Sequence, residues 1–316
     1  MSSIRAYAPA SIGNVSLGFD LLGAALAPVD GQLLGDWVEV ESSTEFAITV
    51  DGHFSDRLPP EPDNNIVKHC HDFFQQALVS HGLEQLQVKL HLHKALPIGS
   101  GLGSSASSIV ATFYALNDYA QKSFDEDKLL LMMGELEGQI SGSIHYDNVA
   151  PSYLGGMTLM TGTERPVALS LPVFDDWYWV VSYSGLSVST AAARKILPRQ
   201  YDLATCLAFG RQLSVFIDAL HKNDRQMAAN MMQDVIAEEH RKTLLPGFDD
   251  ARRFVDTQNG LAFGISGSGP TVFAVTDSLT SAQCIEQWLN KHYVQNADGF
   301  SHICKIDTQG TRLINA

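Results

Sequence analysis

The segment Leu96–Ser108 reads LPIGSGLGSSASS and places three glycines and five serines within thirteen residues. Glycines at alternate positions allow a backbone to turn through positive φ and to approach a ligand closely. A helix that begins at Ser104 would direct its free N–H groups and the positive end of its dipole toward whatever the loop encloses. The segment therefore predicts an anion site suited to phosphates, although a helix entry made of small residues has the same composition.

This loop differs from two common nucleotide-binding motifs. No lysine follows the glycines, as it would in a Walker A loop. The spacing is GxGxG, and the loop comes almost a hundred residues into the chain, which does not fit a Rossmann fingerprint. We therefore expect a phosphate site of another type.

A second glycine-rich run, SGSGP at Ser266–Pro270, lies between predicted strands at Leu261–Ile265 and Thr271–Thr276. Taken alone, such a run favours a tight hairpin. Two loops of this kind in one chain also suggest a shared ligand, and their spacing does not decide between the two interpretations.

Length and composition restrict the class of protein. The chain has 316 residues, 45% of them hydrophobic, which is enough for about two domains with packed cores. The formal net charge of −14 argues against wrapping nucleic acid, since phosphate neutralisation needs clustered Lys and Arg. No stretch reaches 18 apolar residues, and four widely spaced cysteines fit reduced thiols. We expect a soluble cytoplasmic protein without a membrane segment.

Predicted strands and helices interleave without the strict βαβ rhythm of a doubly wound sheet, which indicates an α+β fold. A helix capped by Asn64 or Asn65 is expected to end near Gly82, and another is expected over Arg225–Glu239. The run TGTERP at 161–166 is a plausible crossing between domains. We therefore predict two domains, 1–162 and 163–316.

Two further clusters carry polar groups suited to chemistry. Asp147 and Asn148 lie in SIHYDNVAPS, where His145 could bind a substrate carboxylate or satisfy a loop carbonyl. Glu135 or Glu137 could hold Mg²⁺ beside a phosphate, because that ion takes one or two carboxylates plus phosphate oxygens and water. Exposed helix glutamates are common, so each of the two, taken alone, is interpreted as a surface residue.

The chain resembles the homoserine kinases, a family of the GHMP superfamily of small-molecule kinases, over nearly its whole length. The motifs that carry the resemblance are ASIGNVSLGFDLLG at 10–23, PIGSGLGSSAS at 97–107, HYDNVAPSYLGG at 145–156, VSTAAARKILP at 188–198, EEHRKTLLPGF at 238–248 and GISGSGP at 264–270. The resemblance to the superfamily as a whole depends only on the glycine loops. The first motif, the HYDNVAP run and the two arginine-bearing segments are specific to homoserine kinases.

The resemblance implies an N-terminal α+β domain, a ferredoxin-like C-terminal domain and an ATP site between them. Ser105 and Glu137 would coordinate Mg²⁺, and Asn65 would contact adenine. The ATP-binding residues implied are Asn65, Pro97, Ile98, Gly99, Ser100, Gly101, Leu102, Gly103, Ser104, Ser105, Ala106 and Ser107.

It also implies a site for L-homoserine, whose side-chain hydroxyl would be phosphorylated to O-phospho-L-homoserine, a step of threonine biosynthesis. Asn14 and Asp20 would hold the amino and hydroxyl ends, while His145, Arg194 and Arg241 would surround the carboxylate. The catalytic residues implied are Asp20, Asn148, Thr190 and Arg194.

Asn148 stands where mevalonate-type relatives have an aspartate base, and an amide cannot take a proton. Phosphoryl transfer has a loose transition state, so positioning and charge neutralisation can suffice. The proton would go to the γ-phosphate or to Asp20, and this choice stays open.

Two other functions fit part of the pattern. One is a kinase for another small alcohol, such as a mevalonate-like one, and the other is a catalytically silent binding module. Arg194 and Arg241 favour an amino-acid substrate, and the combination of Ser105 with Glu137 favours catalysis. The partners expected are L-homoserine and ATP but neither nucleic acid nor membrane, with a homodimer as one option.

Overall fold

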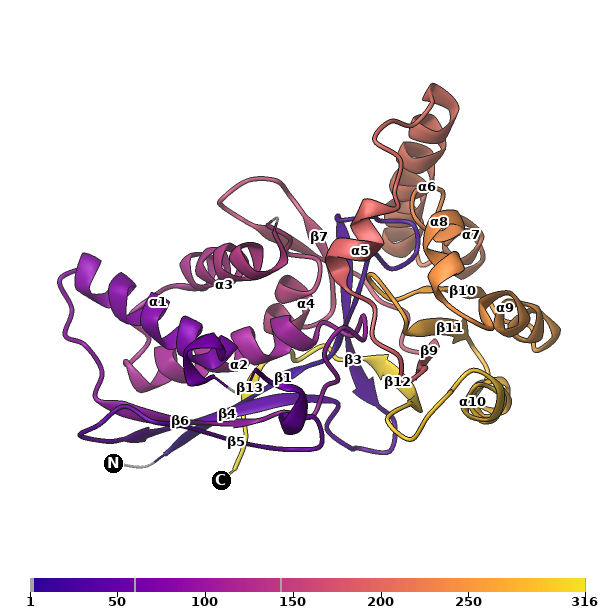
Figure 1. The fold of residues 1–316 in the computed structure, drawn as a ribbon. Coiled ribbons are helices and arrows are strands. Elements are labelled where there is room, and N and C mark those ends of the chain that lie inside the picture. Colours follow the sequence, from indigo (N-terminus) through magenta and orange to yellow (C-terminus); the bar gives the residue numbers. More distant parts are fainter. Residues whose placement is uncertain (1–2, 60, 143, 316) are drawn as a thin grey trace.

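The computed structural model describes residues 3–59, 61–142 and 144–315, which form two sheets with helices packed against them (Figure 1). This arrangement confirms the predicted α+β class.

The N-terminal sheet has five strands, and only β5 and β6 pair in parallel. The helices α1, α2 and α3 cover one of its faces (Figure 1), and α2 packs directly against β1 and β4. In sheet order the strands are β13 (Arg312–Leu313), β1 (Ile4–Pro9), β4 (Gly35–Ser42), β6 (Val88–His93) and β5 (Ile48–Asp51). The helices of this part are α1 (Ile66–Ser80), α2 (Ser104–Tyr119), α3 (Glu126–Ser141) and α4 (Val149–Leu154), with short 3₁₀ turns at Ser55–Arg57 and Pro62–Asn64.

Helix α2 lies in the middle of this layer and is buried on nearly every side, as expected for a helix enclosed by other elements. Its residues Ile109, Phe113 and Leu116 are fully buried among side chains of α1, α3, β4 and β6. The predicted α1 is found with Asn65 as its N-cap, whose side chain accepts from the Val67 N–H. The buried core of this layer therefore fixes the start of α2, where the first glycine loop ends.

The second sheet has eight strands drawn from both halves of the chain. Its strands, in sheet order, are β10 (Ala262–Ile265), β11 (Val272–Thr276), β9 (Tyr178–Tyr183), β12 (Phe300–Ile306), β3 (Leu22–Pro28), β7 (Met157–Met160) and β8 (Ala168–Leu171), and β2 (Ser11–Gly13) also pairs with β3.

Strands β9 to β12 form the ferredoxin-like unit that the resemblance implies. Along the chain they run β9, helices, β10, β11, a helix and β12, and their order in the antiparallel sheet is β12-β9-β11-β10. The helices are α5 (Thr190–Lys195), α6 (Leu203–Lys222), α7 (Arg225–Met231), α8 (Glu238–Arg241), α9 (Phe248–Thr257) and α10 (Leu279–His292), with a 3₁₀ turn at Lys242–Leu244.

Alternate residues of the central strands face two different cores. Trp179 on β9 and Phe273 on β11 pack with Phe216 of α6. Their neighbours Val180 and Ala274 point to the opposite face, where α9 and α10 cover them. A strand covered on both sides is expected to be apolar throughout, which is why the predicted strands here lack clear alternation.

The run TGTERP does not cross between separate layers. It forms the loop of the β7–β8 hairpin, in which Met160 pairs with Ala168. Thr161 closes the loop, since its backbone N–H donates to the carbonyl of Val167 over 3.1 Å. A boundary after residue 162 would divide this hairpin, and the division into 1–162 and 163–316 stays a prediction.

The helix predicted over Arg225–Glu239 is interrupted. Helix α7 ends at Met231, and α8 begins at Glu238. Between them the Asp234 carboxylate accepts from the backbone N–H groups of Ile236 and Ala237 over 2.7 and 2.8 Å. Such local side-chain bonds compete with a continuous helix, and here they reorient α8 toward the cleft described below.

Helix α6 is, within the described ranges, the one helix whose length and composition would allow it to cross a membrane. It is instead anchored to the eight-stranded sheet by one stripe, Phe216, Ala219 and Leu220. Most of its other residues, including Leu203 and Leu207, are exposed or half-buried.

We predict that Phe216→Ala lowers the free energy of unfolding by about 3–5 kcal/mol, because it leaves a cavity between α6 and the sheet. Leu207→Ala on the same helix, at a side chain 56% exposed, should change it by less than about 0.5 kcal/mol. Urea unfolding of both variants measures the difference, and equal effects would contradict this account of how α6 is held.

Candidate active site

A cleft with a volume of about 320 Å³ lies where the two glycine loops, the start of α1 and the helices α5 and α8 meet. One end is mostly apolar and the other carries charged groups. The described residues that line it are Asn14, Asp20, Leu58, Pro59, Asn64, Ile66, His69, Lys94, Ile98, Gly99, Ser100, Gly101, Gly103, Ser104, Ser105, Ser108, Glu137, His145, Asp147, Asn148, Thr190, Arg194, Arg241, Gly267 and Ser268.

The two glycine loops touch each other, which the sequence alone left open. The Ser266 hydroxyl donates to the carbonyl of Gly101 over 2.6 Å, and the Thr271 N–H donates to the carbonyl of Ser100 over 3.0 Å. Gly101 has φ +83°, and a Cβ at that position would overlap the carbonyl of Ser266. The second run is therefore both a hairpin between β10 and β11 and a wall of the cleft.

Helix α2 begins in the cleft with its first N–H groups uncapped. Its N-cap is Gly103 in the left-handed region at φ +65°, a residue without a side chain to bond those groups. Ser104 and Ser105 follow it, and all three line the cleft. The loop and helix dipole together favour an anion here.

Ser105 and Glu137 lie in contact, as the resemblance implies. The Ser105 hydroxyl donates to the Glu137 carboxylate, and both residues line the cleft. Burial raises the pKa of Glu137, while the bond from Ser105 and the charge of Lys94 oppose that rise. Glu135 is exposed, on another face of α3. Of the two glutamates weighed from the sequence, Glu137 is thus the one placed to meet a ligand.

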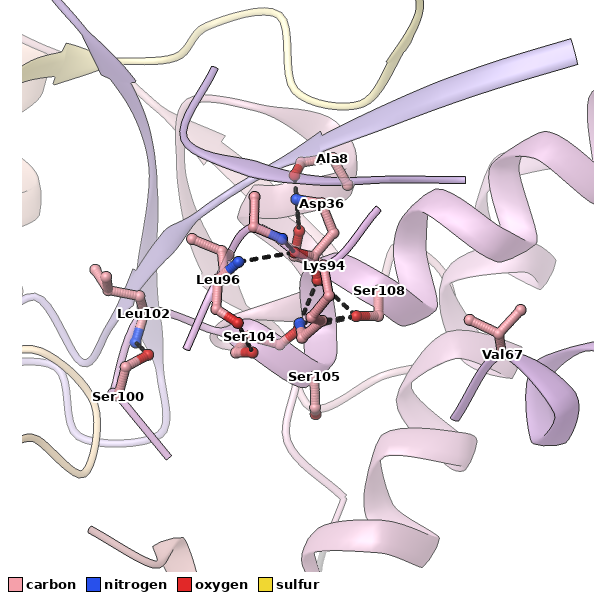
Figure 2. A network of polar contacts seen from close by, with 12 residues as sticks. Ala8, Asp36, Val67, Lys94, Leu96, Ser100, Leu102, Ser104, Ser105 and Ser108 are labelled. Carbon is pink, nitrogen blue, oxygen red and sulfur yellow. Dashed lines mark hydrogen bonds and ion pairs between the residues drawn. The ribbon is translucent and has the colours of Figure 1, made fainter. Parts of the chain in front are cut away.

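Sequence reasoning missed a buried ion pair beneath the glycine loop (Figure 2). Lys94, 2% exposed, pairs with Asp36, 0% exposed, and its Nζ also donates to the Ser104 carbonyl and the Ser108 hydroxyl, both over 3.0 Å. Asp36 in turn accepts from the backbone N–H of Leu96 over 3.0 Å. The pair ties both ends of the loop together. The sequence offered only two signals of this ion pair: a lysine at the end of one apolar strand and an aspartate at the start of another.

Asp20, Arg194 and His145 form a linked group at the other end of the cleft. Arg194 Nη2 donates to Asp20 Oδ1 over 2.7 Å and to His145 Nδ1 over 3.2 Å. Burial lowers the pKa of His145; Asp20 opposes this shift, and Arg194 adds to it. A neutral imidazole fits its acceptor role toward Arg194. Within the described ranges Arg194 Nε is buried without a hydrogen-bond partner.

Arg241 is a buried cation, 3% exposed, on the short helix α8. Its Nη1 donates to the carbonyl of Gly267 over 2.6 Å and its Nε to the carbonyl of Ala193 over 3.3 Å. No carboxylate among the described residues lies within ion-pair distance of it, although burial lowers its pKa and the more distant charges of Asp234, Asp20 and Asp147 oppose that shift. The ring of Phe19 lies beside the guanidiniums of both Arg241 and Arg194.

Asn14, Asn148 and Thr190 also line this end. Asn14 is in the left-handed region at φ +70°, and its amide joins two segments by donating to the carbonyl of Gly267 over 3.3 Å and accepting from the Asp20 N–H over 2.9 Å. Asn148 Oδ1 accepts from the Ser11 hydroxyl over 2.9 Å. Thr190 opens α5 directly after its N-cap.

Five residues of the expected ATP site do not line the cleft. The Asn65 amide is occupied as the cap of α1, and its neighbours Asn64 and Ile66 line the apolar end instead. The remaining four, Pro97, Leu102, Ala106 and Ser107, are buried. Ser107, for example, donates to the carbonyl of Ala8 over 2.8 Å. These buried side chains lie under the loop and support its backbone conformation.

Family models and solved structures match this chain. The model described as GHMP kinases N terminal domain matches residues 65–156, and that described as GHMP kinases C terminal matches residues 216–295. A homoserine kinase from Cytophaga hutchinsonii is 34% identical with a TM-score of 0.88, over 99% of this chain and 98% of that chain.

Two more distant structures share the fold. A protein described as a putative homoserine kinase from Listeria monocytogenes is 19% identical with a TM-score of 0.73, over 100% of both chains. A mevalonate kinase is 16% identical with a TM-score of 0.70, over 97% of this chain and 99% of that chain. The two family models and the homoserine kinase structure at 34% identity show that the chain belongs to the GHMP kinases.

We predict that Lys94→Met lowers the free energy of unfolding by about 3–5 kcal/mol, because it leaves the Asp36 carboxylate buried without a counter-charge. Lys94→Met with Asp36→Asn should recover about 2 kcal/mol, since the amide still accepts from the Leu96 N–H and carries no charge. Urea unfolding compares the two. Equal losses would show that the pair acts through packing alone.

Proposed function

We propose that this GHMP kinase transfers the γ-phosphoryl group of ATP to the side-chain hydroxyl of L-homoserine. The product would be O-phospho-L-homoserine, an intermediate of threonine biosynthesis. The observation that carries the proposal is a buried arginine, Arg241, which has no carboxylate within ion-pair distance among the described residues and lies in the same cleft as the glycine loop. The 34% identity to a homoserine kinase supports it.

The cleft offers ATP two suitable environments. Its apolar end, at Leu58, Pro59 and Ile66, suits a base. The glycine loop and the uncapped start of α2 suit the triphosphate. Both features line one continuous cleft, so ATP could occupy them together without a rearrangement of the chain.

The residues present also fit Mg²⁺. One carboxylate, Glu137, and one hydroxyl, Ser105, lie together beside the phosphate loop, and this ion takes few protein ligands when phosphate oxygens complete its shell. When bound, Mg²⁺ would neutralise charge on the phosphates. No group of three or more His, Cys, Asp or Glu suited to a metal occurs within the described ranges.

An amino acid fits the opposite end of the cleft. Arg194 and Arg241 both line this end, and a guanidinium matches a carboxylate in shape and charge. Mevalonate also carries a carboxylate, but the acidic groups at this end, Asp20 and Asp147, favour a substrate that brings a positive charge as well.

Catalysis would then rest on positioning. The substrate oxygen forms a bond to the γ-phosphorus as the bond to the bridging oxygen of ADP breaks, and the substrate proton passes to the transferred phosphate. Asn148 cannot accept a proton, and Asp20 is engaged by Arg194, so these side chains orient the hydroxyl instead. Thr190 would close the same side of the cleft.

The decisive experiment is ADP release from Mg·ATP across small alcohols that include L-homoserine, L-threonine and mevalonate. We expect the highest kcat/KM with L-homoserine. A higher value with mevalonate would replace the proposed substrate. ATP binding without turnover of any alcohol would identify a silent binding module.

The cytoplasmic location and the homodimer stay predictions from the sequence. Size-exclusion chromatography with light scattering tests the second of these directly.

Ser105→Ala and Glu137→Gln should each lower kcat/KM for Mg·ATP by about 10²–10³-fold, because each removes charge neutralisation at the transferred group. Glu135→Gln on the same helix is the control and should behave like the unmodified chain. Steady-state kinetics at saturating L-homoserine give the comparison. Rates within twofold for both site variants would place the metal elsewhere.

Arg241→Leu should lower kcat/KM for L-homoserine by about 10²-fold or more, because a buried charged pair contributes a few kcal/mol. The loss should be far smaller for 3-aminopropan-1-ol, which lacks the carboxylate. Kinetics with both compounds measure the ratio. An unchanged ratio would mean that the carboxylate binds elsewhere.

A further inference from the structure

Helix α8 carries Arg241 to the cleft, yet little within the helix itself fixes its position. It has only four residues, Glu238–Arg241, and the side chain of its N-cap, Ala237, forms no capping bond. Of the four residues, Arg241 alone is buried. A helix of a single turn is not stable by itself, so contacts with neighbouring elements must hold it.

One of these contacts is an ion pair outside the cleft, between α8 and α9. Glu238 Oε1 lies 2.5 Å from Arg252 Nη2, and neither residue is among the described residues that line the cleft. The side chain of Glu238 is 13% exposed and that of Arg252 is 35% exposed. The pair is therefore more sheltered than the exposed ion pairs that contribute little to a structure.

Arg252 is itself fixed against β10. Its Nη2 also donates to the carbonyl of Phe263 over 3.4 Å, and its guanidinium lies 5.3 Å from the ring centres of both Phe248 and Phe263. A planar guanidinium can stack on aromatic rings and donate hydrogen bonds in its own plane. Arg252 therefore links Glu238 to β10.

These contacts close a ring through the second glycine loop. Phe263 lies in β10, the strand that leads into this loop, and the Gly267 carbonyl of the loop accepts from Arg241 Nη1 over 2.6 Å. Arg241 follows Glu238 by three residues, about one turn of α8. The ring thus runs from Glu238 through Arg252, β10 and Gly267 to Arg241, and back along α8.

The charge of Glu238 is unfavourable for folding. Burial raises the pKa of Glu238 to about 7, the charge and hydrogen bond of Arg252 oppose this shift, and the charges of Asp234 and Glu239 add to it. Because an unfolded glutamate has a pKa of about 4.3, ionisation of Glu238 opposes folding, and the cost grows as the pH rises from that value to the folded one. A stabilising role therefore does not account for this ion pair.

We propose that Glu238 is a positioning residue, which holds Arg241 in the orientation that receives the substrate carboxylate. It acts through its ion pair with Arg252, which fixes α8 against α9 and β10, and it does not touch the substrate. This inference rests on the proposed function, because it assigns a support to the arginine that the proposal places at the carboxylate.

The test compares L-homoserine with 3-aminopropan-1-ol, which lacks the carboxylate. In Glu238→Gln the ratio of kcat/KM for L-homoserine to that for the amine should fall about tenfold, because a displaced Arg241 affects only the compound with a carboxylate. The loss should appear chiefly in the KM for L-homoserine, while the KM for Mg·ATP stays within about twofold. Glu239→Gln is the matched control: its carboxylate is exposed and pairs with Lys242 over 2.9 Å, so the ratio should not change.

Thermal unfolding separates positioning from a stabilising role. Because ionised Glu238 opposes folding at a pH above its folded pKa of about 7, the ligand-free Glu238→Gln variant should unfold at pH 8 at a temperature equal to or above that of the unmodified chain. L-Homoserine at one fixed concentration should raise the unfolding temperature of the unmodified chain more than that of the variant.

A double-mutant cycle tests whether the two residues act as one unit. Arg252→Gln should lower the same ratio about tenfold or more, and adding Glu238→Gln to it should lower the ratio no further. Losses that multiply, to about a hundredfold or more, would show that the two side chains act independently and would overturn the role of the pair.

The outcomes distinguish the two levels of the proposal. An unmodified chain that releases no ADP with L-homoserine overturns the proposed function and this inference together. Turnover of L-homoserine with an unchanged ratio in Glu238→Gln overturns only the role of Glu238. An equal loss for both compounds, with a lower unfolding temperature at pH 8, would make the pair a structural one and likewise overturn that role. If Glu238→Gln does not fold, Glu238→Asp, whose shorter side chain should not reach Arg252, is measured in the same way.

Discussion

The contact between the two glycine loops is the constraint on which the rest of the cleft depends. Its bonds, from Ser266 to Gly101 and from Thr271 to Ser100, join segments about 165 residues apart in sequence. Backbones approach this closely only where no Cβ intervenes, as at Gly101. This contact brings the helix start that suits phosphate to the arginines of α5 and α8, which belong to the other half of the chain.

The charged groups differ between the two ends of the cleft. The Lys94–Asp36 pair is neutral as a unit, so it stiffens the phosphate loop without placing a net charge under it. At the far end one ion pair, Asp20–Arg194, is complete within the protein, and the buried Arg241 donates to backbone carbonyls and has no carboxylate within ion-pair distance among the described residues. A site of this kind carries a cost to folding that binding offsets, which is common for preorganised functional groups.

The fold class and most helices could be predicted from the sequence, because helical spacing is a local signal. The residues alone left Glu135 and Glu137 open, and only the resemblance to homoserine kinases paired Glu137 with Ser105. The break after Met231 could not, since it depends on the side chain of Asp234. The contact of Asn65 with adenine stays a prediction: its side chain caps α1, and its neighbour Asn64 lines the cleft. The role of Lys94 depends on burial, which no local pattern near it reveals.

Strand pairing between the two ends of the chain has a consequence for how the protein is made. Ala6 on β1 pairs with Leu313 on β13, and Leu26 on β3 pairs with Ile306 on β12, close to where the chain ends meet the first sheet (Figure 1). On the ribosome the first strands emerge long before these partners exist. Their edges stay unpaired until β12 and β13 have emerged, a period in which such edges are prone to misassembly. Cooperative closure of both sheets therefore awaits these two strands, and a nascent chain halted after β11 would hold both glycine loops but lack β12, the strand that joins β3 to β9.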